Sequence, residues 1–479
     1  MTAKESALLM SRLRFRPLLQ ASALAAALAL VPVTTAALAQ VDSDSYRELD
    51  QFMDVFNIVK AQYVDNVDNK VLVKGAIQGM LAALDPHSSY EEGADYENLR
   101  IQTEGNYGGL GLTVTSEDGA VKVIAPQEDT PAFRAGIKSG DYITHIDGKL
   151  LYGLTLDEAI GQMRGKPGTR IALRLVRRGA EKPIEVSLTR EVIVQKPVKW
   201  DVKGDIGIIN INTFSDRTSD YARDAIAQIR KKLGRDPIGY IVDLRDNGGG
   251  LLSEAVSVSD LFLNTGEIVS QRGRAKTDIQ RYRAEPGDAT NGLPIVVLVN
   301  SGTASASEIV AGALQDHHRG LVIGERSFGK GSVQSLLKLG PRAEIRLTTA
   351  RYFTPSGRSV QEGGIDPDIV VPNLSDPDYK TRPVFREDDL RRHLINEAKV
   401  DNKVLEEDTK PDPRLIATAD DLKAKKIDDF QLYYALQTIA RLGGPQQVAA
   451  IARIGTPLPR LVETAPSASA PAPAAAPKP

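Results

Sequence analysis

Residues suited to covalent chemistry lie in the segment 300–308, which follows an apolar run at 295–299 and leads into a helical pattern. Ser305 therefore stands at a predicted strand-to-helix turn, where a hydroxyl is exposed beside unpaired backbone N–H groups. Ser305 and Glu308 also make the S-x-x-E pattern of a capping box, a common structural device. This segment alone favours a nucleophile and a helix cap equally.

A serine nucleophile needs a base. His317 and His318 follow on the same predicted helix, roughly 18 Å from Ser305 at 1.5 Å per residue, and cannot reach its hydroxyl. Lys330 stands between glycines in a turn, and a buried lysine can act as a base because burial lowers its pKa. Gln334 follows in an extended segment on the same side as Lys330, so its amide oxygen can accept a hydrogen bond from the lysine and orient it.

Acyl transfer also requires hydrogen-bond donors for the developing oxyanion. The glycines at 248–250 follow an apolar run at 240–244 and leave backbone N–H groups unshielded at the end of a predicted strand. The alternative interpretation of these glycines is a tight turn without a catalytic role.

Composition excludes several other kinds of site. The 479 residues include no cysteine, which removes disulfides, thiolate zinc sites, iron–sulfur clusters and a thiol nucleophile. The sequence has no H-E-x-x-H motif and its five histidines are scattered, so we expect no metal and no other cofactor. A net charge of −2 gives no general electrostatic footprint for nucleic acid, and we expect none as a partner.

The segment 324–331 resembles a phosphate-binding loop, because it matches G-x-x-x-x-G-K after an apolar run. Gly331 stands where that motif needs a Ser or Thr to hold magnesium, and residues 332–337 are predicted to be extended rather than helical. Nucleotide binding is therefore disfavoured.

The elements that position these residues follow from hydrophobic periodicity. Residues 200–375 alternate apolar β-rich runs with helical patterns, which predicts an α/β core. Residues 98–190 contain short β-rich runs and one helical stretch at 155–163. Further helical patterns occupy residues 44–95, 390–398 and 430–442. The expected fold class is α/β: a mixed α/β core with an inserted β-rich domain that has short helices, and helical N- and C-terminal flanks.

The first forty residues are typical of a secretory signal peptide. Arg12, Arg14 and Arg16 precede an apolar run at 18–31, and small residues at 37–39 make an A-x-A cleavage site. The run is shorter than the ~20 apolar residues of a membrane span. We expect export and cleavage, after which the protein is soluble in the periplasm.

A glycine-rich loop precedes one strand of the β-rich region. Gly109, Leu110, Gly111 and Leu112 can offer free backbone N–H groups to a terminal carboxylate. The strand beside this loop can accept a peptide by β-augmentation.

Together, these segments resemble the carboxy-terminal processing peptidases, also called tail-specific proteases. The matching segments are 84–90, 109–112, 130–136, 140–143, 244–250, 302–308, 328–334, 351–358 and 364–368. The resemblance implies Ser305 as nucleophile, Lys330 as base and Gln334 as its orienting partner. The organisation that we expect is a signal peptide (1–39), an N-terminal helical region (40–96), a PDZ domain (97–190), an α/β serine protease core (191–375), a C-terminal helical region (376–462) and a disordered Ala/Pro tail (463–479).

The resemblance also places the oxyanion donors at Ala306 and at Gly249 or its neighbour Gly248. Many relatives carry Pro where this chain has Gly248, and glycine can adopt a proline-compatible backbone. The PDZ domain is implied to receive the substrate's C-terminus through residues 109–112 and to gate access to the core.

The function that we expect is an exported serine endopeptidase that selects protein substrates by their C-terminal tails and cleaves them with a Ser/Lys dyad. Expected partners are protein or peptide substrates, an adaptor or activator, and further copies of the chain in a homo-oligomer. Two alternatives stay open: a non-catalytic or adaptor-gated PDZ scaffold in the cell envelope, and a Ser-His hydrolase that uses His87, His145 or His393.

Overall fold

The computed structural model describes residues 43–117, 119–275, 277–379, 381–397 and 418–442. The predicted signal peptide at 1–39 and the Ala/Pro tail at 463–479 lie outside the described residues. The chain divides into two units, residues 1–75 and 76–479. The first unit holds helix α2 (Ser43–Gln62) and the beginning of α3 (Asn69–Ala82). The features described below belong to the second unit.

The second unit is built on a six-stranded sheet of order β10-β11-β12-β15-β16-β19. Its strands are β10 (Val198–Lys203), β11 (Ile206–Ile211), β12 (Gly239–Asp243), β15 (Ile295–Val299), β16 (Leu321–Gly324) and β19 (Ile369–Val370). The edge strand β10 pairs antiparallel with β11, and every other neighbouring pair is parallel. The predicted α/β core is confirmed.

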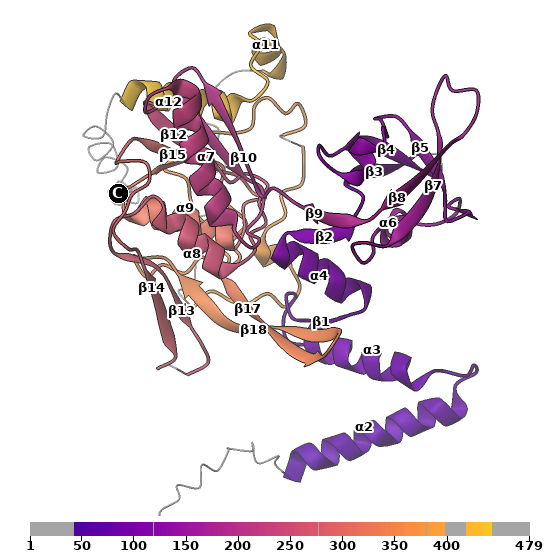
Figure 1. Cartoon of the computed structure of the whole chain (residues 1–479). Coiled ribbons are helices and arrows are strands. Elements are labelled where there is room, and N and C mark those ends of the chain that lie inside the picture. Colours follow the sequence, from indigo (N-terminus) through magenta and orange to yellow (C-terminus); the bar gives the residue numbers. More distant parts are fainter. Residues whose placement is uncertain (1–42, 118, 276, 380, 398–417, 443–479) are drawn as a thin grey trace, which may run out of the picture. The chain divides into compact units, whose positions relative to one another are not determined.

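Helices cover both faces of this sheet (Figure 1). One face packs against α7 (Thr218–Leu233), α8 (Leu252–Asp260) and α9 (Ala306–Asp316), and the other against α12 (Phe430–Leu442). Residues of β11 alternate between the two clusters: Ile209 and Ile211 face the first, whereas Ile206 and Ile208 face the second. Burial on both faces explains why the parallel strands are continuously apolar.

A second sheet has the order β1-β18-β13-β14, with β17 also paired to β18. Its strands are β1 (Ser89–Glu92), β13 (Glu267–Arg272), β14 (Ile279–Arg283), β17 (Ser332–Gly340) and β18 (Ala343–Phe353). Ser89 of β1 pairs with Arg346 of β18. A segment from the start of the second unit is therefore part of the same sheet as the hairpin that follows Lys330.

A separate sheet of order β3-β4-β5-β7-β8 has its own hydrophobic core. Its elements are β3 (Leu112–Glu117), β4 (Ala120–Pro126), α5 (Pro131–Arg134), β5 (Tyr142–Ile146), β6 (Lys149–Leu150), α6 (Leu156–Met163), β7 (Arg170–Val176) and β8 (Ile184–Thr189). Strand β3 lies at one edge of this sheet, where its outer backbone groups are open to pairing.

The chain passes into and out of this β-rich domain through a two-stranded ribbon. Strand β2 (Asn106–Gly109), which follows α4 (Ala94–Glu104), pairs antiparallel with β9 (Glu191–Val194). Beyond the ribbon, the Gln195 N–H donates to the Gly105 carbonyl at 2.8 Å. The first and last residues of the domain are thus held side by side.

Two predicted helical stretches need correction. Residues 89–92 form strand β1, because they pair with β18, and residues 390–397 are not helical. Beside the latter, only the short 3-10 helix η1 (Glu387–Asp389) forms. Glu362 contacts His393 Nε2 at 2.8 Å and accepts from the Asn396 N–H at 3.0 Å, so tertiary hydrogen bonds replace the helical pattern. Among the described residues of the C-terminal flank, the helices are α11 (Ala419–Ala424) and α12.

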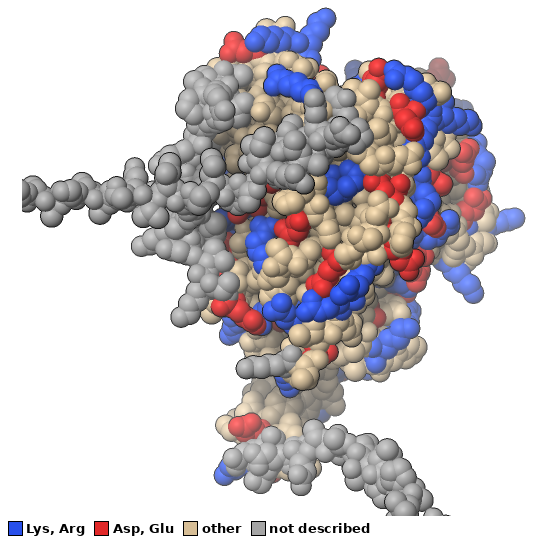
Figure 2. Space-filling view, turned by 90° about the vertical axis from the view of Figure 1, so that its left-hand side faces the viewer, with Lys and Arg blue, Asp and Glu red and all other residues tan. Residues whose placement is uncertain are grey.

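Acidic and basic side chains are interspersed on the face shown in Figure 2, in keeping with the nearly balanced charge. Within the described part of the chain, no helix combines the length and apolar character that a bilayer crossing requires.

Candidate active site

Three loops meet at the carboxyl edge of the central sheet. They follow the neighbouring parallel strands β12, β15 and β16, so the topology brings them to one edge. The Thr303 hydroxyl donates to the Leu244 carbonyl at 2.9 Å, and the Ala304 N–H donates to the Asn247 carbonyl at 3.0 Å. The Phe328 N–H donates to the Thr303 carbonyl at 2.9 Å and joins the third loop to the second. The three motifs singled out in the sequence are therefore directly hydrogen-bonded to one another.

Ser305 lies at the start of α9 with φ 56° and ψ −115°, a backbone conformation that non-glycine residues rarely adopt. Such a conformation costs about 1–3 kcal/mol and persists only where surrounding contacts hold it. The Ser305 side chain makes no cap hydrogen bond to the helix, and the Glu308 N–H donates to the Ser305 carbonyl instead. The Glu308 carboxylate in turn accepts from the Ser305 N–H at 2.7 Å, which is the reciprocal half of a capping box.

Glu308 is fully buried and links the loop that carries Ser305 to the loop that carries Lys330. Its Oε2 accepts from the backbone N–H of Ser305 at 2.7 Å and of Lys330 at 3.0 Å. Its Oε1 accepts from the Ser327 hydroxyl at 2.5 Å and the Gly329 N–H at 2.7 Å. Burial raises the pKa of Glu308 to about 7, and the hydrogen bonds to Ser327 and to the three backbone N–H groups oppose that rise.

Tyr352 supports the same arrangement from β18. Its buried hydroxyl lies 3.1 Å from the Ser305 carbonyl and 3.4 Å from Glu308 Oε2, and it also donates to the Lys330 carbonyl. Burial raises the pKa of Tyr352 well above its usual value, so the hydroxyl keeps its proton and remains a donor.

Lys330 lies in a turn that only glycine neighbours allow. A Cβ on Gly331 would lie 2.5 Å from the Gln361 backbone nitrogen, and Gly329 has φ 95°. The Gly331 N–H donates to Gln361 Oε1 at 3.0 Å, and the Glu362 N–H donates to the Gly329 carbonyl at 2.9 Å. The backbone on either side of the lysine is therefore fixed in place.

The surroundings of Lys330 disfavour its charged form. Burial lowers the pKa of its ammonium group, and the nearby cation Arg346 lowers it further. Glu387, Glu308 and Asp85 act in the opposite direction without reversing the shift. A lysine in this environment is neutral at a lower pH than an exposed one.

The predicted catalytic residues line one cavity of about 420 Å³. The residues that line it are Leu99, Gln102, Thr103, Thr213, Phe214, Gly248, Gly249, Gly250, Leu251, Leu252, Ser305, Ala306, Ile309, Lys330, Ser332, Val333, Gln334, Leu336, Arg346 and Tyr352. Ser305, Lys330, Gln334, Gly249 and Ala306, which were singled out from the sequence, all lie on its wall. The described residues of this wall include no histidine.

The glycine loop approaches the serine closely. A Cβ on Gly249 would lie 2.8 Å from the Ser305 Cβ and 2.9 Å from the Ala306 nitrogen, so only glycine fits there. The Gly249 N–H donates to Asn247 Oδ1 at 2.9 Å, whereas no partner for the N–H of Gly248 or Ala306 occurs among the described residues. The loop and the start of α9 together offer backbone donors beside the serine.

Gln334 lies on the cavity wall with a specific orientation. Its amide nitrogen donates to Ser332 Oγ at 3.0 Å and to Thr348 Oγ1 at 3.3 Å. A register shift between Val333 and Gln334 interrupts the regular alternation of β17. These two consecutive residues therefore both line the cavity. The described residues show no hydrogen bond between Gln334 and Lys330.

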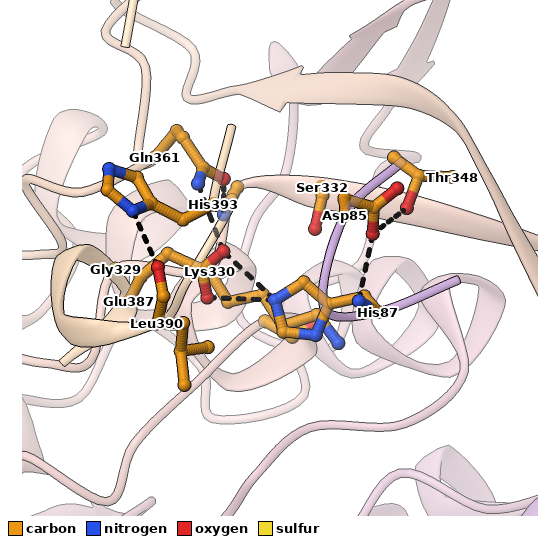
Figure 3. Close-up of polar contacts among 12 residues, drawn as sticks. Asp85, His87, Gly329, Lys330, Ser332, Thr348, Gln361, Glu387, Leu390 and His393 are labelled. Carbon is orange, nitrogen blue, oxygen red and sulfur yellow. Dashed lines mark hydrogen bonds and ion pairs between the residues drawn. The ribbon is translucent and has the colours of Figure 1, made fainter. Parts of the chain in front are cut away.

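The histidines have other partners. His87 Nε2 lies 2.9 Å from both carboxylate oxygens of Glu387 (Figure 3). His145 Nδ1 contacts the hydroxyl of its neighbour Thr144 at 3.0 Å, and His317 Nε2 contacts the Glu267 carbonyl at 2.6 Å beyond the end of α9. The structure thus provides no Ser-His arrangement among the described residues. They also contain no group of three or more His, Cys, Asp or Glu side chains able to hold a metal ion.

The predicted peptide-binding loop connects β2 to the edge strand β3. Gly111 has φ 75°, and a Cβ there would lie 2.3 Å from the Thr130 side chain. The Ala132 N–H donates to the Leu110 carbonyl at 3.0 Å, and the Gln127 N–H donates to the Gly111 carbonyl at 2.8 Å. The loop carbonyls are engaged inside the domain, which fixes the loop beside the open edge of β3.

Several residues around the cavity were not found from the sequence. Arg346 lies on the wall, its buried Nε has no hydrogen-bond partner among the described residues, and its Nη2 lies 3.8 Å from Glu91. The sequence predicts Glu308 only as a helix cap, and its S-x-x-E spacing with Ser305 is the signal that points to it. The wall residues contributed by α4 had no local sequence signal.

Comparisons with known proteins agree with this architecture. Sequence models match for peptidase family S41 at residues 205–371, for a PDZ domain at 108–188 and for the activating protease CtpB N-terminal domain at 27–94. The carboxy-terminal-processing protease of Bartonella bacilliformis is 49% identical over 355 residues, which cover 74% of this chain and 82% of that protein. Carboxy-terminal processing protease CtpA of Bacillus subtilis is 34% identical, covering 71% of this chain and 72% of that protein.

Among solved structures, the chain is similar to a photosystem II D1 C-terminal processing protease. That similarity has a TM-score of 0.41 and 29% sequence identity, and it covers 69% of this chain and 94% of the other. The sequence relatives, not this structural match, show the family to which the chain belongs. The chain is therefore a member of the carboxy-terminal processing proteases of peptidase family S41 and carries a PDZ domain.

Proposed function

We propose that this protease is a serine endopeptidase in which Ser305 is the nucleophile and Lys330 the general base. The observation that carries the proposal is that both residues line one cavity while a single buried carboxylate, Glu308, fixes the backbone of each. A lowered pKa for Lys330 supports its role as a base.

In this mechanism the Ser305 oxygen forms a bond to the carbonyl carbon of the substrate peptide, and its proton passes to the neutral amine of Lys330. Lys330 returns that proton to the leaving nitrogen as the peptide bond breaks, which leaves an acyl-enzyme. Water then attacks the acyl carbon and gives a proton to Lys330. The bond between that carbon and the Ser305 oxygen breaks, Lys330 returns the proton to Ser305, and the carboxylic acid product leaves. The carbonyl oxygen of Gln334 orients the lysine.

The negative charge that develops on the carbonyl oxygen when Ser305 attacks is stabilised by backbone N–H groups of Ala306 and the glycine loop. We assign the second donor to Gly249, where a Cβ would lie 2.8 Å from the Ser305 Cβ and 2.9 Å from the Ala306 nitrogen, so that its backbone passes close to the serine turn. Its present acceptor, Asn247 Oδ1, is a side-chain oxygen that an incoming oxyanion replaces or shares.

Substrates are selected, in this proposal, by their C-terminal tails. A tail pairs with the open edge of β3, and its terminal carboxylate is received by the loop of Gly109, Leu110, Gly111 and Leu112. The domain limits are those expected from the sequence: the PDZ domain at 97–190 and the protease core at 191–375. Export to the periplasm, removal of residues 1–39, an adaptor or activator, and a homo-oligomer belong to the same proposal.

The decisive experiment compares purified mature protein with its Ser305→Ala and Lys330→Ala variants on an unstructured protein that ends in either an apolar or a charged tail. We expect cleavage by the wild type alone, faster with the apolar tail, and unchanged by a chelator. Cleavage that survives in both variants would rule out the two assignments. A wild type that binds the tails and cleaves neither would favour the alternative of a non-catalytic or adaptor-gated PDZ scaffold.

A further inference from the structure

We infer that Asp85 and Thr348 are positioning residues that set the orientation of the Gln334 amide, so that its carbonyl oxygen, not its nitrogen, is presented to Lys330. This inference rests on the proposed function and concerns residues outside the Ser305, Lys330 and Gln334 set. Neither residue lines the catalytic cavity.

Asp85 is buried and acts only as an acceptor. Its Oδ1 accepts from the Thr348 hydroxyl at 3.0 Å and from the His87 N–H at 2.8 Å (Figure 3), and its Oδ2 accepts from the Ser88 hydroxyl at 2.7 Å. The Thr348 N–H in turn donates to Ser88 Oγ at 3.1 Å. The segment before the PDZ domain therefore fixes both the backbone and the hydroxyl of Thr348, across 260 residues of chain.

The direction of the Thr348 hydrogen bond decides the next one. A hydroxyl has a single proton, and a carboxylate oxygen can only accept, so the Thr348 proton points to Asp85. The remaining lone pairs of Thr348 Oγ1 can only accept. Ser88 Oγ lies 3.5 Å away but gives its one proton to Asp85 Oδ2 at 2.7 Å, which leaves Gln334 as the donor. An amide nitrogen donates and an amide oxygen does not, so Gln334 must turn its nitrogen to Thr348, as it does at 3.3 Å.

The second hydrogen of the Gln334 amide completes the arrangement. It is directed to Ser332 Oγ at 3.0 Å, so both amide hydrogens are used. The Gln334 carbonyl oxygen has no partner within the described residues, and Gln334 and Lys330 line the same cavity. The relay from Asp85 through Thr348 thus leaves an acceptor for the lysine amine. A reversed amide would present a donor to an amine that must keep its lone pair for the Ser305 proton.

Thr348→Val tests this relay, because it removes the hydroxyl and keeps the shape of the side chain. We expect kcat to fall about tenfold or more, as for other losses of a group that orients a catalytic residue, while KM changes little. Thr348→Ser restores the hydroxyl and is expected to restore kcat. Thr349→Val is the matched control, since Thr349 is the exposed neighbour on the same strand and its hydroxyl contacts Ser335.

A double-mutant cycle distinguishes positioning from general stabilisation. If Thr348 acts through Gln334, Thr348→Val has little further effect in a Gln334→Ala background, and Asp85→Ala and Thr348→Val are likewise not additive. Thermal unfolding of each variant gives the folded fraction by which the rates are normalised.

Three results would overturn the inference: wild-type kcat in Thr348→Val, an equal loss in Thr348→Ser, or full additivity with Gln334→Ala. Ser305→Ala in the same assay keeps the two proposals separate. Cleavage that persists in Ser305→Ala removes the proposed function itself, whereas Ser305-dependent cleavage that Thr348→Val leaves unchanged removes only the relay.

Discussion

Ser305 and Lys330 donate their backbone N–H groups to the same oxygen atom, Oε2 of Glu308, at 2.7 and 3.0 Å. The two residues belong to different loops of the sheet edge, and one buried carboxylate sets the distance between their main chains. Small displacements within such a pair can cost large factors in rate, because reacting groups must be aligned closely. The strained turn at Ser305 and the glycine-flanked turn at Lys330 are therefore both hydrogen-bonded to Glu308.

Lys330→Arg tests the need for a base that can lose its proton. The guanidinium group remains charged at every pH at which proteins are folded, so it cannot accept the Ser305 proton. We expect the cleavage rate to fall by about 10²–10⁴-fold, the usual contribution of a general base. Lys338→Arg, on the exposed part of the same hairpin, is expected to cleave as the wild type does. Substantial cleavage by Lys330→Arg would exclude the lysine as the base.

The pH dependence of cleavage reports the lowered pKa of Lys330. In the proposed mechanism neutral Lys330 is the active form, so kcat/KM should rise with pH until the pH passes that pKa. Arg346→Met removes the cation that lowers this pKa and should move the rise to higher pH. Arg342→Met, an exposed site on the same hairpin, should leave the profile unchanged. A profile that moves to lower pH in Arg346→Met contradicts the electrostatic argument.

Glu308→Gln should impair both stability and cleavage. A glutamine keeps one acceptor oxygen and places a donor against backbone N–H groups, which leaves at least one of them unsatisfied in a buried site. That loss costs about 1–3 kcal/mol per group, so we expect the free energy of unfolding to fall by that amount or more. Denaturant titration measures it. Glu325→Gln is the control, since Glu325 is a partly buried carboxylate whose Oε1 accepts from the Asn373 N–H at 3.4 Å.

The ionisation of Glu308 should also be visible in stability against pH. Its pKa is about 7 in the fold and near the ordinary value of 4.5 when unfolded, so the folded state keeps its proton longer. Glu308 therefore makes the free energy of unfolding decrease as pH rises from about 4.5 to about 7, and not above. Glu308→Gln should remove this part of the pH dependence; an identical slope in wild type and variant would refute it.

Gly248→Pro separates the two candidates for the second oxyanion donor. Proline removes the N–H of residue 248 and leaves that of Gly249, and a Cβ at Gly248 would meet nothing within 4 Å. We expect cleavage to stay within a few-fold of the wild type, as measured by kcat. Loss of a true oxyanion donor costs about 10²–10³-fold, and a decrease of that size would assign the donor to Gly248.

Gly111→Ala tests the tail-binding loop without touching the protease core. A Cβ at this position would overlap the Thr130 side chain, so the loop must move. We expect the preference for an apolar tail to be lost, while cleavage of a tail-independent substrate continues. Gly148→Ala is a matched control, because Gly148 has φ 76° against 75° for Gly111 but has open space around it. Equal tail preference in both variants would place tail recognition elsewhere.

The residues that the sequence predicts for the site line one cavity, and the signals that point to them are local. The approach of the three loops follows from parallel strands, the choice of Lys330 from its glycine neighbours, and the exclusion of His317 from helix geometry. The orientation of Gln334 was not predictable, since it depends on Thr348 and, through it, on Asp85 far away in the chain. The helical prediction for 390–398 failed because contacts with Glu362, absent from any local window, determine the path of residues 393–396.

The ribbon of β2 and β9 has a consequence for how the chain tolerates change. The two ends of the β-rich domain are already paired, so for the core this domain is a closed loop. The entropic cost of closing a loop changes slowly with the number of residues in it. Insertions within 110–190, or exchange of the whole segment for another that starts and ends on neighbouring strands, should leave the folding of the core intact. Because none of the described residues that line the cavity at Ser305 lies within 110–190, such changes should also leave the cavity wall intact.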